Sequence, residues 1–196
     1  MALLMARTSV RQTRQESRER IVRAAELLVR KRSYSELTVD EVMSEAGLGR
    51  TIFYRHFDDL GDLLMRSSRA AIEELFEAQS SLVAARPGDI RGALRAAADV
   101  YQRYGPLLRC VSEAAAVDER IAEGYAAMRE RFDAFAEQSL HRVLGDGGHA
   151  DLAETARALN LMNETYLTDA FGREPRVSPE VAVRTLGEIW DAVIRR

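Results

Sequence analysis

The chain has 196 residues, of which 46% are hydrophobic and 30% are charged. This length suffices for one or two domains with a hydrophobic core, and the composition is typical of a globular protein. A single cysteine, Cys110, excludes an internal disulfide and a cysteine-based zinc site. No apolar segment has the length of a signal-peptide core or of a membrane span, so we expect a cytoplasmic protein.

Charge is distributed unevenly along the chain. Residues 1–32 contain nine basic and three acidic side chains, a net charge of +6, whereas the whole chain has a net charge of −3. The remaining residues therefore carry −9. A basic N-terminal arm on an acidic body favours a local contact with a polyanion, and the alternative is a solvated, arginine-rich helix end.

The first predicted helix covers residues 16–32, where apolar residues recur with the spacing of one helical face. That face contains Ile21, Ala24, Ala25, Leu28 and Val29. Residues 38–47 predict a second, short helix. Thr38 and Glu41 have the spacing of a capping box, and Gly47 is placed to end the helix in the left-handed conformation.

Another short helix, "RTIFYRHF", is expected at residues 50–57, after a turn that contains Gly47 and Gly49. Two short helices joined by such a turn are typical of a helix-turn-helix unit. Phe53 and Phe57 are four residues apart and are expected to anchor the second helix. The opposite face carries side chains suited to base edges and phosphate oxygens, namely Arg50, Thr51, Tyr54 and Arg55. This pattern predicts a DNA-binding surface; the alternative is a helical hairpin whose aromatic side chains only fill a core.

Helical periodicity continues through the rest of the chain. A longer helix is predicted at about residues 60–82, with Asp58 or Asp59 as its N-cap. "ARPGD" forms the clearest boundary in the chain, and five more helices are expected beyond it, with Pro106 in the first turn of the second. These five are expected at about residues 89–105, 106–117, 119–144, 151–171 and 178–194. The sequence thus predicts an all-α fold of about nine helices.

Few titratable residues suggest chemistry in this chain. His141 and His149 are eight residues apart across a glycine-rich loop, which is poor spacing for a zinc site. Arg109 and Glu113 are four residues apart and predict an ion pair, and Cys110 beside them predicts a small buried side chain. No nucleophile–base pattern, phosphate loop or metal cluster is present, so no cofactor is expected.

Residues 16–66 resemble the TetR family of bacterial transcription regulators. The resemblance is carried by the amphipathic first helix, "LTVDEV", "AGL", the motif "FYRHF" and a leucine-rich fourth helix. It implies an all-helical homodimer that binds palindromic operator DNA through its first three helices and a small ligand through its C-terminal domain. The implied division is a flexible basic arm at 1–15, a helix-turn-helix domain at 16–58 and a ligand-binding and dimerisation domain at 59–196.

Carried over by position, the resemblance implies DNA contacts along the basic arm and both helices of the unit. The residues concerned are Arg14, Arg18, Thr38, Gly49, Arg50, Thr51, Tyr54, Arg55 and His56. Two positions depart from the family pattern. Leu60 stands where a phosphate-binding lysine is common, and Ile52 stands where a small hydroxylated residue is usual. We expect the arginines of the basic arm to compensate for the missing lysine.

Residues 158–167, "ALNLMNETYL", resemble the ligand-binding domain of a mycobacterial repressor of this family. Asn160 and Asn163 share a helical face and match two asparagines that line a narrow, largely apolar tunnel in that relative. Buried amides must be paired, so the alternative is an asparagine pair that bonds neighbouring helices. The expected ligand contacts are Tyr101, Tyr104, Asn160, Asn163 and Leu167.

The resemblance implies a repressor that leaves its operator when a small apolar molecule binds. A dimer is expected through the last two helices, at Ala156, Leu159, Leu186, Ile189, Trp190 and Val193. Two alternatives remain. One is a DNA-binding regulator without a ligand, whose C-terminal domain only dimerises. The other is a helical enzyme with an incidental helix-turn-helix unit, for which the C-terminal half offers little beyond Asn160, Asn163 and Glu164.

Overall fold

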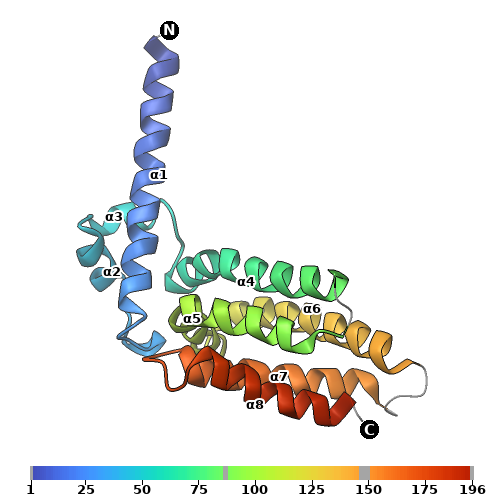
Figure 1. Ribbon diagram of the computed structural model, residues 1–196. Coiled ribbons are helices and arrows are strands. Elements are labelled where there is room, and N and C mark those ends of the chain that lie inside the picture. Colours follow the sequence, from blue (N-terminus) through green and yellow to red (C-terminus); the bar gives the residue numbers. More distant parts are fainter. Residues whose placement is uncertain (1, 86–87, 146–150, 195–196) are drawn as a thin grey trace.

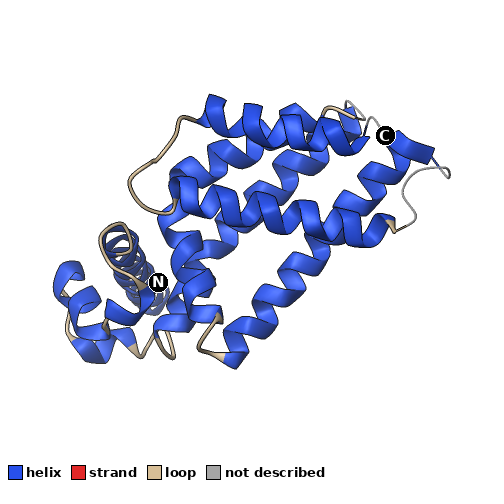
Figure 2. Ribbon diagram, turned by 90° about the horizontal axis from the view of Figure 1, so that it is seen from below, coloured by secondary structure: helices blue, strands red, loops and turns tan. Residues whose placement is uncertain are grey.

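The computed structural model describes residues 2–85, 88–145 and 151–194. Within these ranges every regular element is helical, as Figures 1 and 2 show: eight α-helices and one short 3₁₀ helix. The predicted all-α fold class is therefore confirmed. A small N-terminal group of helices lies at one end of a larger bundle, and the first helix extends well beyond both (Figure 1).

The N-terminal unit consists of α1 (Ala2–Leu28), the 3₁₀ helix η1 (Tyr34–Glu36), α2 (Val39–Ala46) and α3 (Arg50–Phe53). Its core contains most of the predicted stripe of the first helix together with apolar residues of the next elements. Its buried members include Ile21, Ala24, Ala25, Val29, Leu37, Val42, Met43, Phe53 and Phe57. Leu63 and Leu64 of α4 complete this core, so the unit is closed by a helix that also belongs to the larger domain.

The first helix is longer than expected. We expected a flexible arm at residues 1–15 and a helix from residue 16, whereas α1 already begins at Ala2. No proline or glycine occurs between residues 2 and 28, so nothing in the sequence interrupts the helix. The basic residues of the arm therefore lie along a helix that projects from the molecule (Figure 1).

The larger domain is a bundle of α4 (Leu60–Ala85), α5 (Ile90–Ala115), α6 (Glu119–Leu144), α7 (Leu152–Phe171) and α8 (Pro179–Ile194). Helix α5 runs through its centre and packs against all four others. The core of the bundle includes Leu94, Val100, Tyr101, Leu140, Leu159, Leu167, Phe171, Leu186 and Trp190.

The prediction of two helices between residues 89 and 117 was wrong. The structure has one continuous helix, α5, with Pro106 inside it. An internal proline costs a helix about 3 kcal/mol because it lacks an N–H group and crowds the preceding turn. Here Gly105 and Pro106 are both buried, and a Cβ atom at Gly105 would overlap the backbone carbonyl of Phe171. The close packing of α5 against α7 thus offsets the cost of the proline.

Most of the residues expected at a dimer interface are already buried within the single chain. Ala156, Leu159, Leu186 and Trp190 are at most 5% exposed and belong to the core of the bundle. They cannot supply much surface to a second copy, which corrects the prediction for these four. These four residues lie on the inward faces of α7 and α8, whereas a dimer interface requires the outward faces. Ile189 is 40% exposed and Val193 is partly buried, so only these two of the six face outward to any extent.

Candidate nucleic-acid interface and ligand cavity

The second helix begins and ends as predicted. Thr38 is the N-cap of α2, and its hydroxyl accepts a hydrogen bond of 3.2 Å from the backbone N–H of Glu41. Gly47 follows the helix with φ = 62°, in the left-handed region, and its N–H bonds to the carbonyl of Ser44. The left-handed residue turns the chain sharply after α2, so that α3 begins only a few residues later at Arg50.

The third helix is shorter than expected. We predicted a helix over residues 50–57, whereas α3 ends at Phe53. Beyond it the chain makes tighter turns, in which His56 N–H bonds to the Phe53 carbonyl at 2.9 Å. Phe57 N–H bonds to that same carbonyl at 3.0 Å. This backbone keeps Phe53 and Phe57 on the buried side, where their ring centroids are 5.7 Å apart. Their predicted anchoring role is confirmed.

The opposite side of this segment is open to solvent. Its exposed members are Arg50, Thr51, Tyr54 and Arg55, the four residues predicted to meet DNA. Tyr54 is 50% exposed although it is a large aromatic residue. Gly49, the N-cap of α3, lies next to them, with no atom within 4 Å of where a Cβ would be. A side chain at position 49 would therefore meet open space.

The ion-pair partner of Arg50 could not be predicted from the sequence. Its Nη1 atom lies 2.7 Å from each carboxylate oxygen of Asp40, which is in the first turn of α2. Its Nη2 atom donates to the Tyr54 hydroxyl at 3.1 Å. These contacts hold the pKa of Arg50 above its usual range, the Tyr54 hydrogen bond being the larger cause and Asp40 the next.

Helix α1 borders this surface through its middle turns. Arg14 donates a hydrogen bond of 3.1 Å to the backbone carbonyl of Arg55. The guanidinium of Arg18 lies 6.0 Å from the ring centroid of Phe57. The structure thus brings two predicted arginines of the arm beside the third helix, where both cations extend the positive surface.

His56, which we expected to contact DNA, is only partly exposed and already contacts another side chain. Its Nε2 atom lies 2.9 Å from the hydroxyl oxygen of Ser17, and that hydroxyl donates to the carbonyl of Arg14. A hydroxyl has one proton, so while Ser17 donates it to Arg14 the bond to His56 requires the Nε2–H tautomer of the neutral ring. Burial, followed by the nearby arginines 14, 18 and 55, lowers the pKa of His56. In this form His56 joins α1 to the third helix rather than offering a donor to DNA.

The start of α4 is acidic and, as the sequence shows, has Leu60 at the position expected for a lysine. Asp59 caps the helix by accepting a hydrogen bond of 2.8 Å from the backbone N–H of Asp62, so it is the N-cap of the two candidates. Leu60 is partly buried against the N-terminal core. The carboxylates of Asp59 and Asp62 disfavour a phosphate at this helix end.

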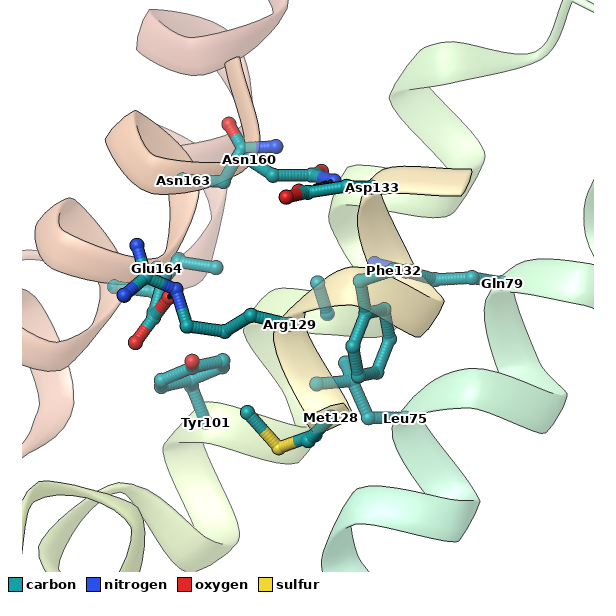
Figure 3. Close-up of a pocket in the computed structure, with 12 residues that line it drawn as sticks. Leu75, Gln79, Tyr101, Met128, Arg129, Phe132, Asp133, Asn160, Asn163 and Glu164 are labelled. Carbon is teal, nitrogen blue, oxygen red and sulfur yellow. Dashed lines mark hydrogen bonds and ion pairs between the residues drawn. The ribbon is translucent and has the colours of Figure 1, made fainter. Parts of the chain in front are cut away.

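A separate cavity of about 60 Å³ lies between the middle turns of α4, α5, α6 and α7 (Figure 3). Half of the residues around it are polar. The lining consists of Leu75, Gln79, Ala97, Tyr101, Met128, Arg129, Phe132, Asp133, Asn160, Asn163, Glu164 and Leu167. Because a water molecule needs about 10–15 Å³ of such volume, the cavity has room for only a few waters in this state.

The two asparagines both line this cavity and both bond to other helices. Asn160 donates a hydrogen bond of 2.9 Å from Nδ2 to Asp133 of α6, on the opposite wall in Figure 3. Asn163 accepts one of 3.1 Å at Oδ1 from the indole N–H of Trp190 in α8. Both alternatives considered for the pair therefore have support in the structure: the amides are partnered across helices, and they face the cavity.

The other expected ligand contacts separate into two groups. Tyr101 and Leu167 line the same cavity, and burial raises the pKa of Tyr101 far above its usual range. Tyr104 does not line it. Its side chain borders a different hollow, beside Val29, which follows α1, and Pro106 of α5. Residues three apart can share a helical face, yet only Tyr101 of the two tyrosines reaches this cavity.

The walls include charges that the expected apolar tunnel lacks. Arg129 of α6 forms an ion pair of 3.2 Å with Glu164 of α7. The Tyr125 hydroxyl also donates a hydrogen bond to Glu164. With Asp133 added, two carboxylates and one guanidinium border the space. The signal for this was present in "MRERFD" of α6, whose helical spacing puts Arg129 and Asp133 on one face.

The two domains meet at a buried arginine. Arg109 of α5 is 7% exposed and forms the predicted ion pair with Glu113. It also donates to backbone carbonyls at the end of α1, those of Val29 at 2.8 Å and Arg32 at 2.7 Å. Cys110 beside it is buried as predicted, and burial raises the pKa of its thiol to about 11.

Other kinds of site find no support in the described ranges. No cluster of three histidine, cysteine or acidic residues in them could hold a metal ion. His141 is in the last turn of α6, and His149 lies outside the described residues. A separate search of the same residues finds no helix of the length and apolarity that crossing a membrane requires.

Known proteins resemble both parts of the chain. The family model described as "Bacterial regulatory proteins, tetR family" matches residues 21–65, which comprise the helix-turn-helix unit and the start of α4. The HTH-type transcriptional regulator EthR of Mycolicibacterium smegmatis is 25% identical over 192 residues, which cover 94% of this chain and 88% of that relative.

Two solved structures show the same fold. A transcriptional regulator from Rhodococcus sp. Rha1 has a TM-score of 0.73 at 19% identity, covering 91% of this chain and 96% of that one. A transcriptional regulator from Saccharomonospora viridis, in complex with choline, has a TM-score of 0.69 at 17% identity, covering 90% of this chain and 96% of that one. These proteins are regulators and not enzymes. The helix-turn-helix geometry, the family match over residues 21–65 and the likeness over nearly the whole chain support a TetR-type, DNA-binding transcriptional regulator that is similar to EthR.

Proposed function

We propose that the protein is a dimeric repressor in the bacterial cytoplasm that a small molecule releases from its operator. The exposed side of residues 50–55, which comprise α3 and the turn after it, carries the DNA-binding part of this proposal. Arg50, Thr51, Tyr54 and Arg55 are all exposed on a segment fixed by two buried phenylalanines. Arginine can read a guanine edge or contact phosphate, and the hydroxyl groups suit phosphate oxygens.

A dimer would present two such segments to DNA. In a two-fold symmetric complex they would meet successive major grooves, about 34–36 Å apart or a small multiple of this distance. Because the inward faces of α7 and α8 are buried within the subunit, we propose that two subunits pair through the outward faces. Ile189, which is 40% exposed, is the large apolar residue that favours this face.

We propose the cavity between α4 and α7 as the effector site. Its mixed lining favours a molecule with an apolar body and a hydrogen-bonding group, in place of the wholly apolar effector that the sequence suggested. The S. viridis regulator, which was solved with choline, shows that this fold can take a small polar ligand. Because the cavity is only about 60 Å³ here, a larger effector must displace side chains to enter.

Helix α4 supports a coupling between the two sites. Its first turns place Leu63 and Leu64 in the core of the DNA-binding unit, and Leu75 and Gln79 line the cavity further along the same helix. An effector that displaces the cavity end would therefore move the other end with it. A ligand shifts the equilibrium only by its difference in affinity for the two states.

The proposal can be tested in two steps. Fragments from both sides of the gene are first incubated with the purified protein, and retained fragments are sequenced; specific retention of a palindromic site is expected. A library of small molecules with apolar bodies and polar heads is then screened for thermal stabilisation and for release of that site. A stabilising compound that leaves operator affinity unchanged would contradict the regulatory role of the cavity.

The alternative is a DNA-binding regulator without an effector. The pairing of Asn160 with Asp133 and of Asn163 with Trp190 favours it, because these amides are satisfied without a ligand. The variant Leu75→Trp, which fills the cavity from α4, separates the two. Under our proposal this variant abolishes stabilisation by a screened effector, whereas under the alternative no compound stabilises either protein.

A further inference from the structure

The position of Arg50 in its helix does not explain its contacts. Helix α3 has only four residues, so Arg50 belongs to its first and its last turn at once, and the helix neither favours nor disfavours a cation there. Asp40 is in the first turn of α2, where the partial positive charge of the helix N-terminus favours an anion. Helix formation therefore accounts for Asp40 but not for Arg50, and the contact between the two side chains needs another explanation.

Stability is a weak explanation for this contact. The side chains of Arg50 and Asp40 are 56% and 69% exposed, and exposed ion pairs contribute at most about 1 kcal/mol. The geometry is nevertheless specific. One nitrogen of Arg50 faces both oxygens of Asp40, while the second terminal nitrogen bonds to the hydroxyl of Tyr54. The guanidinium also lies 5.8 Å from the centroid of the Tyr54 ring.

We propose that Asp40 is a specificity-determining residue, which holds Arg50 in place to read a guanine and keeps it from contacting phosphate. This inference rests on the proposed DNA-binding surface. A guanidinium has five N–H groups, and Asp40 and Tyr54 engage at most three of Arg50. Two donors or more remain, which is the number needed for the O6 and N7 acceptors of guanine.

The carboxylate restricts what Arg50 can contact. Paired with Asp40, Arg50 adds no net charge to the surface, and a phosphate approaching it would also approach the carboxylate. A neutral base edge meets no such repulsion. Arg50 is moreover already held in one arrangement, so less side-chain entropy is lost when it binds. The pair therefore favours base reading over the sequence-independent binding that free arginines provide.

Removing the carboxylate should therefore lower the preference for particular bases and raise the affinity for DNA of any sequence. In Asp40→Ala, Arg50 becomes a free cation that can reach phosphate. Binding to random-sequence duplex DNA should strengthen. The slope of log K against log salt concentration should steepen by about 0.9 per subunit, the value for one added phosphate contact. The preference for one guanine per half-site should fall from about fivefold or more to about onefold, which is no preference.

The test uses the full-length protein and a pool of random duplex DNA. Enriched sequences and salt-dependent affinities are measured for the unchanged protein, Asp40→Ala, Asp40→Asn and Arg50→Ala. We expect one guanine position per half-site to lose its preference in all three variants, while the other positions keep theirs. Only the two Asp40 variants should bind random DNA more tightly. Far-ultraviolet circular dichroism establishes that each variant is folded.

Glu45→Ala is the matched control, because it removes an exposed acid from the same helix, and none of the described contacts joins Glu45 to Arg50. It should raise general affinity without changing base preference. The same base preferences in Asp40→Ala and the unchanged protein would overturn the inference, as would a guanine preference that survives in Arg50→Ala. Failure of the unchanged protein to bind any duplex DNA would instead overturn the proposed function.

Discussion

Arg109 of α5 donates a hydrogen bond of 2.8 Å to the carbonyl oxygen of Gly172, the residue that follows α7. The same guanidinium bonds to the end of α1, so one side chain connects the cavity-lining helix α7 with the DNA-binding unit. Glu113, its ion-pair partner, accepts a hydrogen bond of 2.7 Å from the backbone N–H of Tyr34 in η1. Four segments of the chain are thus held at one buried point.

Arg109→Met should destabilise the protein strongly. It leaves three backbone carbonyls without their donor and Glu113 without its cation, for which we expect a loss of about 3 kcal/mol or more in the free energy of unfolding. Urea denaturation followed by circular dichroism measures this. Arg95→Met, which removes an exposed pair with Glu180, is the control and should cost less than about 1 kcal/mol. Equal losses in the two variants would refute the structural role of Arg109.

Gly105→Ala should separate α5 from α7. An added methyl group would overlap the carbonyl of Phe171, which belongs to backbone and cannot turn away. We expect a loss of about 1–3 kcal/mol, the usual cost of overpacking a core. Gly49→Ser is the control because the space around Gly49 is open, and it should change stability by less than about 0.5 kcal/mol. A Gly105→Ala protein as stable as the unchanged one would contradict the close approach of these helices.

His56 should make stability depend on pH in mildly acidic solution. Its pKa in the folded protein lies below the value of 6.5 for an unperturbed histidine, mainly because of burial. The unfolded chain therefore binds more protons as the pH falls through 6.5, and stability decreases in that window. His56→Gln should remove this part of the decrease, as measured by urea denaturation between pH 7.5 and pH 5.5, values chosen about one unit either side of 6.5. His141→Gln, which changes a histidine of α6 in the larger domain, should leave the decrease in stability unchanged. Identical pH profiles for the unchanged protein and both variants would refute the effect.

The same histidine gives a second observable. A neutral His56 uses its Nε2–H for Ser17, so it can donate to a phosphate only after it is protonated at Nδ1. If it contacts DNA, operator affinity should therefore rise below pH 6.5 more steeply in the unchanged protein than in His56→Gln. If it only joins α1 to the third helix, the two pH dependences should be parallel.

Ile189 and Trp190, neighbours in α8, should respond to substitution in opposite ways. Ile189→Asp places a charge on the exposed face and should convert a dimer into folded monomers, as sedimentation velocity would show. Trp190→Ala empties part of the core and removes the donor to Asn163, so it should cost about 3–5 kcal/mol of subunit stability. A dimer that survives Ile189→Asp would place the interface elsewhere.

Local signals predicted much of this fold. Thr38 and Gly47 fix the ends of α2 through side-chain and backbone chemistry that lies within ten residues of sequence, and such signals can be recognised without a structure. Pro106 shows the limit of this approach. Its local cost is certain, but the packing that offsets it comes from Phe171, which is far away in sequence.

The candidate sites show the same division. Helical spacing identified the exposed face of α3 and the shared face of Asn160 and Asn163. It could not tell which side of α8 faces the core, because Trp190 is apolar in either case and its burial depends on α5 and α7. Nor could it predict the contact between Asp40 and Arg50, since the turn between α2 and α3 determines where the two side chains meet.

DNA binding by the exposed side of residues 50–55 is the central claim, and Tyr54→Ala combined with Arg55→Ala tests it most directly. Fluorescence anisotropy would compare the doubly substituted and unchanged proteins on the enriched duplex at several salt concentrations. We predict that the unchanged protein binds with an affinity that falls steeply with salt, and that the substituted one loses most of this affinity and has a shallower salt dependence while remaining folded. Unchanged affinity and salt dependence in the substituted protein would contradict the assignment of this surface to DNA.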